Sequence, residues 1–210
     1  MYDVILFDLD GTLTESGIGI TRSVAYALKK HGIIEADQSK LDRFVGPPLI
    51  DSFMRFYGFT AEQARQAVDD YREYYAVKGI FENRVYDGVV PMLKALKAAG
   101  VRCVLATSKP DRYAVQILEH FGLAEYFDFV AGATMDEKRT NKADVIAYAL
   151  AHSAAEKALM VGDREHDIHG AKAHGLASVG VLYGYGSREE LEAAGADYIA
   201  ETAEEILKFV

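Results

Sequence analysis

The sequence has little cysteine, no cluster of basic residues and no long apolar run. The single cysteine, Cys103, cannot form an internal disulfide and lies in an apolar run that predicts a buried core thiol. Acidic residues outnumber Lys and Arg by 32 to 23, and no basic stripe suited to duplex nucleic acid is present. No apolar segment reaches the length of a membrane span, and no signal segment precedes the first strand. We therefore expect a soluble, cytoplasmic protein without nucleic-acid or membrane partners.

Short β-rich runs alternate with helical stretches over most of the chain, and 50% of the residues are hydrophobic. The segments between the later runs, such as "VVPMLKALKAAG" and "YAVQILEHFG", end at glycines, as helices often do. Strands that alternate with helices predict an α/β fold built on a doubly wound parallel sheet. The predicted strands cover 3–7, 102–106, 127–132, 158–162 and 178–184, with a short sixth at 197–200.

One long interval near the N-terminus departs from this alternation. It carries helical patterns such as "ITRSVAYALKKHG" and no convincing strand. It predicts a small helical cap domain at 15–86, inserted after the first strand of a core domain made of 1–14 and 87–210. The flanking segments "ESGIG" and "FENRVYDG" are expected to act as hinges, so that the cap can move relative to the sheet.

Two carboxylates stand close together where the first strand should end. Asp8 and Asp10 follow the apolar run "VILF", and side chains at i and i+2 of an extended chain point to the same face. Like charges at this spacing destabilise each other unless one group holds a proton or a cation neutralises both. This pair therefore indicates a cation site.

Two further polar clusters follow predicted strands. "ATSKP" places Thr107, Ser108 and Lys109 after the second strand, and "GDREHD" places Asp163 and Asp167 after the fourth. Lys142 opens the helix before the fourth strand. Since neighbouring ends of parallel strands face one crevice, we expect a single site. The four aspartates of this site, set against one lysine, require a cation. An all-oxygen ligand set suits Mg²⁺, which also binds substrate phosphate.

The order of these residues resembles the four signature motifs of the haloacid dehalogenase superfamily, over the whole core. The motifs are Asp8-Leu-Asp10-Gly-Thr12, Thr107, Lys142, and Gly162-Asp163 with Asp167. The resemblance implies a Mg²⁺-dependent phosphotransferase in which Asp8 forms an aspartyl-phosphate and Asp10 acts first as an acid and then as a base. It implies that Thr107, Ser108 and Lys142 bind phosphate, and that the metal is held by Asp8, the backbone carbonyl of Asp10, Asp163 and Asp167.

The helical insertion resembles the cap of the phosphoglycolate-phosphatase-like branch, and "VGPPL" caps occur in 5′-nucleotidase-like proteins. This implies hydrolysis of a small phosphorylated metabolite. The stiff "RFVGPPL" turn is expected to present Arg43, Gly46 and Leu49 to the substrate, although it can equally serve only to join two helices. Tyr71, Tyr74 and Tyr75 share one helical face, which we interpret as cap core in preference to a base-stacking surface.

Other functions on the same fold stay open. A dehalogenase is disfavoured, because it lacks the aspartate found here as Asp10. A sugar-phosphate mutase shares the core chemistry but keeps water away from the aspartyl-phosphate. A phosphonate hydrolase requires a cap lysine that forms an imine, and a sensor that binds phosphate without turnover is a candidate from a different class. The cap lysines available for an imine are Lys29, Lys30, Lys40 and Lys78.

Overall fold

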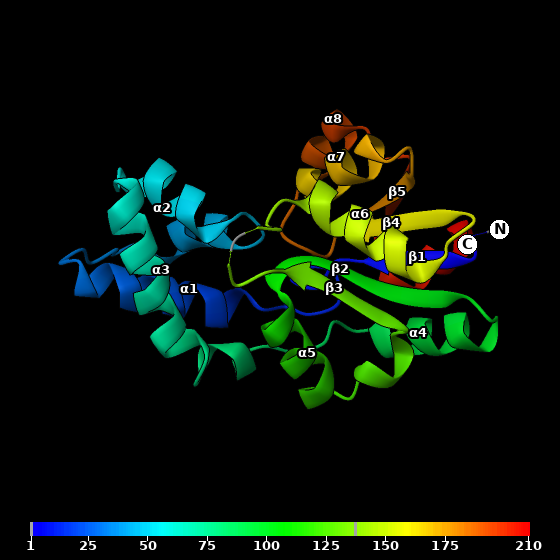
Figure 1. Ribbon diagram of the computed structural model, residues 1–210, viewed down its shortest axis with the longest axis horizontal. Coiled ribbons are helices and arrows are strands. Elements are labelled where there is room, and N and C mark those ends of the chain that lie inside the picture. Colours follow the sequence, from blue (N-terminus) through cyan, green and yellow to red (C-terminus); the bar gives the residue numbers. More distant parts are fainter. Residues whose placement is uncertain (1, 137) are drawn as a thin grey trace. The chain divides into compact units, whose positions relative to one another are not determined.

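A computed structural model describes residues 2–136 and 138–210 and shows a six-stranded sheet (Figure 1). All neighbouring strands pair in parallel, in the order β3-β2-β1-β4-β5-β6. The predicted doubly wound parallel sheet is confirmed. The strands are β1 (Val4–Phe7), β2 (Arg102–Pro110), β3 (Phe129–Ala133), β4 (Ala158–Gly162), β5 (Ala177–Val181) and β6 (Tyr198–Ala200).

Helices cover both faces of the sheet: α6 and α7 lie on one face, and α4 and α5 lie on the other (Figure 1). No helix in the described ranges is long and apolar enough to cross a membrane. The α-helices are α1 (Gly17–Lys30), α2 (Leu49–Tyr57), α3 (Ala61–Tyr75), α4 (Val89–Ala98), α5 (Asp111–His120), α6 (Lys142–Ser153), α7 (Glu165–Ala173) and α8 (Arg188–Ala194). Short 3₁₀ helices are η1 (Gln38–Phe44), η2 (Gly79–Phe81), η3 (Ala124–Tyr126) and η4 (Ala203–Phe209).

Strand β1 is enclosed on both faces, and all four of its residues are buried. Its side chains at Val4 and Leu6 join the core cluster that includes Val145 and Ile146 of α6. A strand buried on both faces reads as a continuous apolar run, which is why "VILF" lacks alternation. Because β1 lies between β2 and β4, the three segments that follow these strands are neighbours.

Three strands end at positions that differ from those expected, and β3 does so by one residue, at Ala133 instead of 132. The predicted strand at 178–184 stops at Val181, because residues 182–186 turn back toward β4. Strand β2 continues to Pro110, past the expected end at residue 106. Its pairing with β3 shifts there, so that residues 107–109 stand opposite Gly132 alone.

Cys103 is buried in β2, which confirms the expected core thiol. Burial, together with the charge of Asp128, raises the pKa of this thiol to about 12. The thiol therefore stays protonated at neutral pH and is a poor nucleophile.

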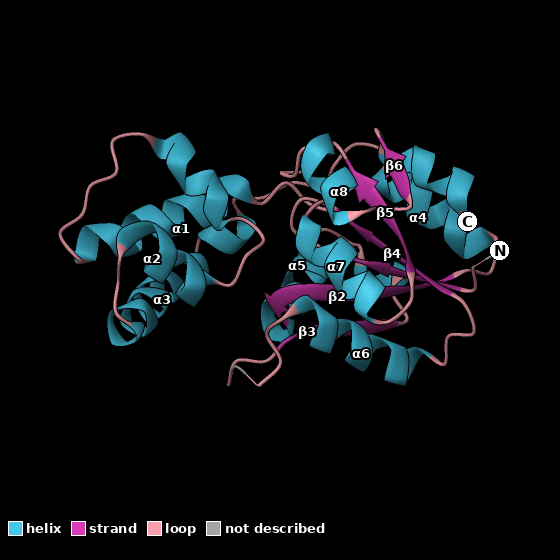
Figure 2. Cartoon of the chain, turned by 90° about the horizontal axis from the view of Figure 1, so that it is seen from above, coloured by secondary structure: helices cyan, strands magenta, loops and turns pink. Residues whose placement is uncertain are grey.

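Residues Ser16–Arg84 form one compact unit, and the rest of the chain forms the other. The Ser16–Arg84 unit consists of helices joined by loops (Figure 2). Just outside this unit, the segments that enter and leave it are joined by an antiparallel bridge between Thr14 and Val85. That the unit acts as a movable cap stays a prediction.

The expected hinge "ESGIG" is partly helical, since α1 already begins at Gly17. A Cβ atom on Gly19 would lie 1.9 Å from the carbonyl oxygen of Gly79, so the glycine permits close packing of α1 against η2. Residues 17–19 of the expected entry hinge are therefore helical, and Gly19 provides space for packing. Movement of the cap about the rest of this segment stays a prediction.

The tyrosine face of α3 packs inside the helical unit. Tyr71 and Tyr75 are buried and stack with ring centroids 5.1 Å apart. The hydroxyl group of Tyr74 donates to the carboxylate of Glu82. These contacts confirm the interpretation of this face as core.

Candidate active site

The ends of β1, β2 and β4 bring the sequence motifs to one edge of the sheet. Asp8 follows β1, Thr107 lies near the end of β2, and Asp163 follows β4. Lys142 is the first residue of α6, whose start is fixed by a hydrogen bond from the Asp144 amide to the side chain of Asn141. In open parallel sheets this carboxyl edge is where ligands bind.

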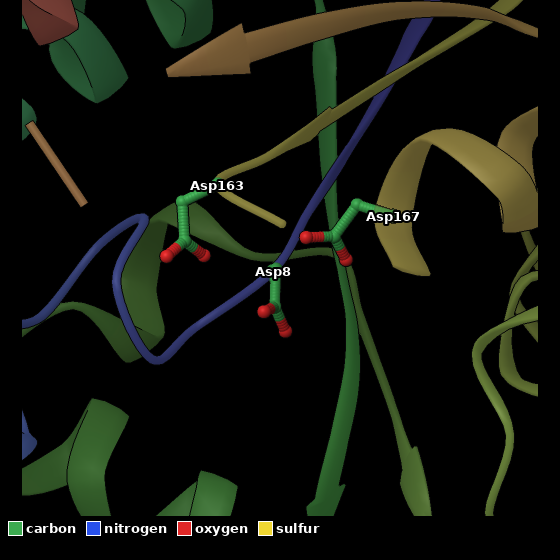
Figure 3. Close-up of side chains that lie close together, drawn as sticks. All are labelled: Asp8, Asp163 and Asp167. Atoms are coloured by element: carbon green, nitrogen blue, oxygen red, sulfur yellow. The ribbon is translucent and has the colours of Figure 1, made fainter. Parts of the chain in front are cut away.

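Three carboxylates converge at this edge (Figure 3). One oxygen from each of Asp8, Asp163 and Asp167 lies within 4.8 Å of the other two, and all three residues are buried. Two unit charges at this separation repel by about 3.5 kcal/mol at an effective dielectric constant of 20. The cluster therefore destabilises the fold unless a cation or a proton reduces its charge.

Asp163 has no exposed surface and is held by two donors. The Thr12 hydroxyl group donates to Oδ1 at 3.3 Å, and the Tyr185 amide donates to Oδ2 at 2.8 Å. Burial and the charges of Asp167 and Asp8 raise the pKa of Asp163 well above its ordinary value, although the Tyr185 hydrogen bond opposes this. Because two donors fix its position, the Asp163 carboxylate is suited to act as a metal ligand.

Glycines surround Asp163 and leave no room for side chains. A Cβ atom on Gly11 would lie 2.1 Å from Asp163 Oδ2, and one on Gly184 would lie 2.4 Å from Asp163 Cβ. A Cβ atom on Gly186 would lie 2.0 Å from the Asp163 carbonyl oxygen. Gly11 also has a φ of 86°, a conformation that favours glycine. The Gly11 turn and the turn after β5 together fix the position of Asp163.

Lys142 joins two of the three carboxylates. Its Nζ lies 2.8 Å from Asp8 Oδ1 and 2.8 Å from Asp167 Oδ1, and it donates to the carbonyl oxygen of Ala106. Burial disfavours the charged lysine, but the charges of Asp167 and Asp8 outweigh burial and raise the pKa of Lys142 above its ordinary value. Lys142 is therefore an ammonium ion that restrains the carboxylate of Asp8.

Asp167 is buried on the first turn of α7, and its Oδ2 accepts a hydrogen bond from the Arg164 amide at 3.1 Å. Burial raises the pKa of Asp167 to about 6, with Lys142 opposing and Asp8 adding to the shift. A Cβ atom on Gly162 would lie 2.2 Å from Asp167 Cγ, so the glycine of the fourth motif permits this approach.

Asp10 lies apart from the three converging carboxylates and has a lysine of its own. Lys109 Nζ lies 2.8 Å from Asp10 Oδ2, and the two side chains are 5% and 11% exposed. This buried ion pair gives the site a second positive charge. Asp10 thus differs from Asp8 in its surroundings, as two carboxylates with different roles should.

Thr107 and Ser108 occupy the irregular end of β2. Thr107 is buried, and its hydroxyl oxygen accepts a hydrogen bond from the Lys109 amide at 3.2 Å. Ser108 is half-buried beside it. Their predicted contact with phosphate stays a prediction.

The residues at this edge fit a divalent cation. Asp8 Oδ1 and Asp167 Oδ1 are buried and accept no well-directed hydrogen bond within the described part of the chain, although the Lys142 ammonium lies close to both. The three converging aspartates against Lys142 leave two negative charges, which a divalent cation would neutralise. Carboxylate oxygens without His or Cys favour Mg²⁺ over zinc.

The predicted specificity residues belong to the Ser16–Arg84 unit. The Arg43 guanidinium stacks over the ring of Phe56 at 4.2 Å, Gly46 has a φ of 100°, and Leu49 begins α2. The turn joins η1 to α2, which is compatible with both of its interpretations. A role in substrate choice stays a prediction.

Sequence reasoning missed two features of the site: the ion pair of Lys109 and the turn after β5. Lys109 follows Thr107 and Ser108 directly, so its place in a strand-end cluster was a signal for the site. The first two residues of the turn "YGYG" fall within the predicted strand at 178–184, although two glycines within four residues indicate a turn.

The chain matches the haloacid dehalogenase-like hydrolase family over residues 5–181. It is 47% identical over 194 residues to a 5′-nucleotidase of Pseudomonas aeruginosa, covering 91% of this chain and 88% of that protein. It is 40% identical to the tyrosine-protein kinase PtkA of Mycobacterium tuberculosis, covering 95% of this chain and 69% of the kinase. It is 30% identical to a phosphoglycolate phosphatase of Vibrio parahaemolyticus, covering 99% and 95% of the two chains.

Among solved structures, a predicted phosphatase from Clostridium acetobutylicum is similar over the entire chain. The TM-score is 0.97 at 51% sequence identity, and the match covers 100% of this chain and 98% of that one.

Proposed function

Because the chain belongs to the haloacid dehalogenase-like hydrolases, we propose that it is a Mg²⁺-dependent phosphatase of small phosphate monoesters. Relatives named 5′-nucleotidase and phosphoglycolate phosphatase support a phosphoric monoester hydrolase. The single observation that carries the mechanism is the placement of Asp8. Asp8 directly follows β1, and its carboxylate lies close to those of Asp163 and Asp167. The Lys142 Nζ lies 2.8 Å from Asp8 Oδ1.

In the first step, Asp8 attacks the phosphorus atom of the substrate. A bond forms between the Asp8 carboxylate oxygen and phosphorus while the ester P–O bond breaks, and Asp10 gives a proton to the departing oxygen. A carboxylate attacks without first losing a proton, and covalent catalysis divides one difficult displacement into two easier ones.

In the second step, water attacks the aspartyl-phosphate and releases phosphate. Asp10 takes a proton from the water as its oxygen bonds to phosphorus, and the Asp8–phosphorus bond breaks. The step restores Asp8 as a carboxylate and Asp10 as a proton donor.

Charge on the transferring group would be balanced by a bound metal ion and by side chains of the site. Asp8, Asp163 and Asp167 would hold Mg²⁺, which supplies positive charge to the phosphoryl oxygens. The Lys142 ammonium adds a second positive charge, and Thr107 with Ser108 supplies hydroxyl donors. Positioning and charge stabilisation of this kind are the main contributions of protein to phosphoryl transfer.

The substrate class follows from relatives and from the helical unit. We infer a nucleoside monophosphate or a small acidic phosphate such as phosphoglycolate, since relatives carry both names. Groups that touch only phosphate cannot distinguish these substrates, so the choice falls to residues such as Arg43 and Leu49.

The relationship to a tyrosine kinase favours a second candidate, transfer of the phosphoryl group to a tyrosine hydroxyl group in place of water. The first step would be the same, with Asp8 attacking the terminal phosphate of a nucleotide. Phosphate release from monoesters and alkali-stable labelling of tyrosine by γ-labelled ATP separate the two candidates, because the aspartyl-phosphate common to both is hydrolysed in alkali.

A screen of phosphate monoesters with Mg²⁺ and with EDTA tests the proposal. We expect Mg²⁺-dependent release of phosphate from at least one monoester. Transfer to another carbon of the same sugar would indicate a mutase, whereas phosphate binding without turnover would indicate a sensor. A phosphonate hydrolase is disfavoured at Lys30, because hydrogen bonds to Asp70 and Glu73 raise the pKa of this lysine and disfavour an imine.

A further inference from the structure

Lys109 is a second buried lysine in the site, and none of the roles described above uses it. Its Nζ lies 2.8 Å from Asp10 Oδ2, and both side chains are almost fully buried. Lysine is rarely buried without a partner, because removing its charge from water is unfavourable. The burial of Lys109 beside Asp10 therefore indicates that this lysine acts on Asp10.

The irregular end of β2 places Lys109 in this position. Residues 107–109 stand opposite the single residue Gly132, and an extra residue in one strand redirects side chains and increases local twist. The Lys109 amide donates to Thr107 Oγ1 at 3.2 Å, which holds the bulge. A Cβ atom on Gly132 would lie 2.8 Å from the Lys109 carbonyl oxygen, so only glycine permits this backbone approach.

The two oxygens of Asp10 have different surroundings. Oδ2 faces the Lys109 ammonium, while Oδ1 is buried and accepts no hydrogen bond from residues 2–136 or 138–210. An ammonium group donates three hydrogen bonds and accepts none. Whenever Asp10 carries a proton, that proton must therefore reside on Oδ1.

We propose that Lys109 is a positioning residue that holds Asp10 Oδ2, so that Oδ1 faces the oxygen of the leaving group. The proposal rests on the phosphatase function given above. In the first step the proton moves from Oδ1 to the leaving oxygen as the ester bond breaks. In the second step Oδ1 takes a proton from the attacking water. Lys109 keeps its own protons throughout.

The test compares Lys109→Met and Lys109→Arg on two substrates, p-nitrophenyl phosphate and an alkyl phosphate. The nitrophenolate ion leaves without a proton, whereas an alkoxide requires one. We expect Lys109→Met to lower kcat/KM for the alkyl phosphate by about 10- to 100-fold, part of the contribution typical of general acid catalysis, and for p-nitrophenyl phosphate by about threefold or less. Lys109→Arg should restore part of the loss, because it keeps a buried donor.

The ratio kcat/KM is the right quantity, because it reports steps up to departure of the leaving group and excludes hydrolysis of the aspartyl-phosphate. The second step has its own readout. Slower water activation in Lys109→Met should produce a burst of p-nitrophenolate equal to the enzyme concentration, since phosphorylated Asp8 would accumulate.

A double-mutant cycle with Asp10→Asn shows whether Lys109 acts through Asp10. We expect Lys109→Met to cause no further loss on the alkyl phosphate once Asp10 is Asn. Lys97→Met, at an exposed lysine on α4, is the matched control and should leave both substrates unchanged.

Equal losses on both substrates, or the full loss of Lys109→Met in the Asp10→Asn background, would overturn the proposal. Either result would assign Lys109 to phosphate binding or to folding. Absence of turnover in the unsubstituted protein is a different outcome and would contradict the phosphatase function itself.

Discussion

Replacing Asp163 with Asn should stabilise the metal-free protein at neutral pH. Asn has nearly the same shape, and its Oδ1 can still accept the hydrogen bond from the Tyr185 amide. Its amide group can donate to the Thr12 hydroxyl oxygen, which accepts as readily as it donates. The substitution therefore removes one charge from a crowded anionic site while keeping the local hydrogen bonds.

Two upper limits apply to the gain in stability on replacing Asp163 with Asn. Repulsion from Asp8 and Asp167, each with an oxygen within 4.8 Å, sums to about 7 kcal/mol at an effective dielectric constant of 20. Asp163 can avoid this by binding a proton. Keeping a carboxyl group of ordinary pKa 3.8 protonated at pH 7.5 costs about 5 kcal/mol, at 1.36 kcal/mol per pH unit. The gain from Asn therefore cannot exceed about 5 kcal/mol, and we expect at least about 2 kcal/mol.

The sign of the pH dependence follows from the raised pKa values. A carboxyl group whose pKa is raised on folding contributes stability below its unfolded pKa, and that contribution is lost as pH rises through the folded pKa. Burial raises the pKa of Asp167 from 3.8 to about 6, and that of Asp163 rises well above 3.8. Metal-free protein should therefore lose stability from about pH 4 upward. The advantage of Asp163→Asn should be near zero at pH 4 and large at pH 7.5.

Thermal unfolding followed by circular dichroism, at pH 4 and pH 7.5 and in EDTA and in Mg²⁺, measures the gain in stability and its dependence on pH. A gain of 2 kcal/mol corresponds to a rise in Tm of about 4 to 8 °C for a chain of this length. Unsubstituted protein should gain stability from Mg²⁺, whereas Asp163→Asn should gain little. Asp87→Asn, at an exposed position, should change Tm by about 1 °C or less. If Asp163→Asn unfolds at a lower temperature than the parent in EDTA at pH 7.5, the carboxylates do not repel as reasoned here.

Four further substitutions test the remaining assignments. Asp8→Asn should abolish turnover while leaving the circular dichroism spectrum unchanged, and turnover close to that of the parent would contradict the nucleophile assignment. Lys142→Met should destabilise the fold by about 3 kcal/mol in urea unfolding, opposite in sign to Asp163→Asn, because it leaves buried carboxylates unpaired. Arg43→Ala and Leu49→Ala should change the ratio of kcat/KM between nucleoside monophosphates and phosphoglycolate, and equal losses on both would place specificity elsewhere.

The sheet and the order of its motifs were predictable because they depend on periodicity. Apolar runs alternating with helices predict parallel strands, and parallel strands bring their carboxyl ends together. That Asp8 and Asp163 should meet follows from the pattern of strands and helices alone. The glycine of "DG" likewise indicated a turn at Gly11, where φ is positive.

The features that were not predictable depend on backbone irregularity. The side chain of Lys109 reaches Asp10 only because the pairing of β2 with β3 shifts, and no pattern of apolar residues encodes such a shift. The donor to Asp163 from the turn after β5 is the amide of Tyr185, and every non-proline residue offers an amide. Residue type therefore gave no signal for this contact.

The bridge between Thr14 and Val85 has a consequence for how such a protein can evolve or be redesigned. Residues paired across an antiparallel bridge have Cα atoms about 5 Å apart, a gap that a two-residue turn can close. The two segments that connect the Ser16–Arg84 unit to the sheet domain therefore lie side by side at one point. The helical insert can be gained, lost or exchanged at this point without any change in strand order. A recombination event at this one point would exchange the helical unit and leave the carboxyl edge of the sheet unchanged.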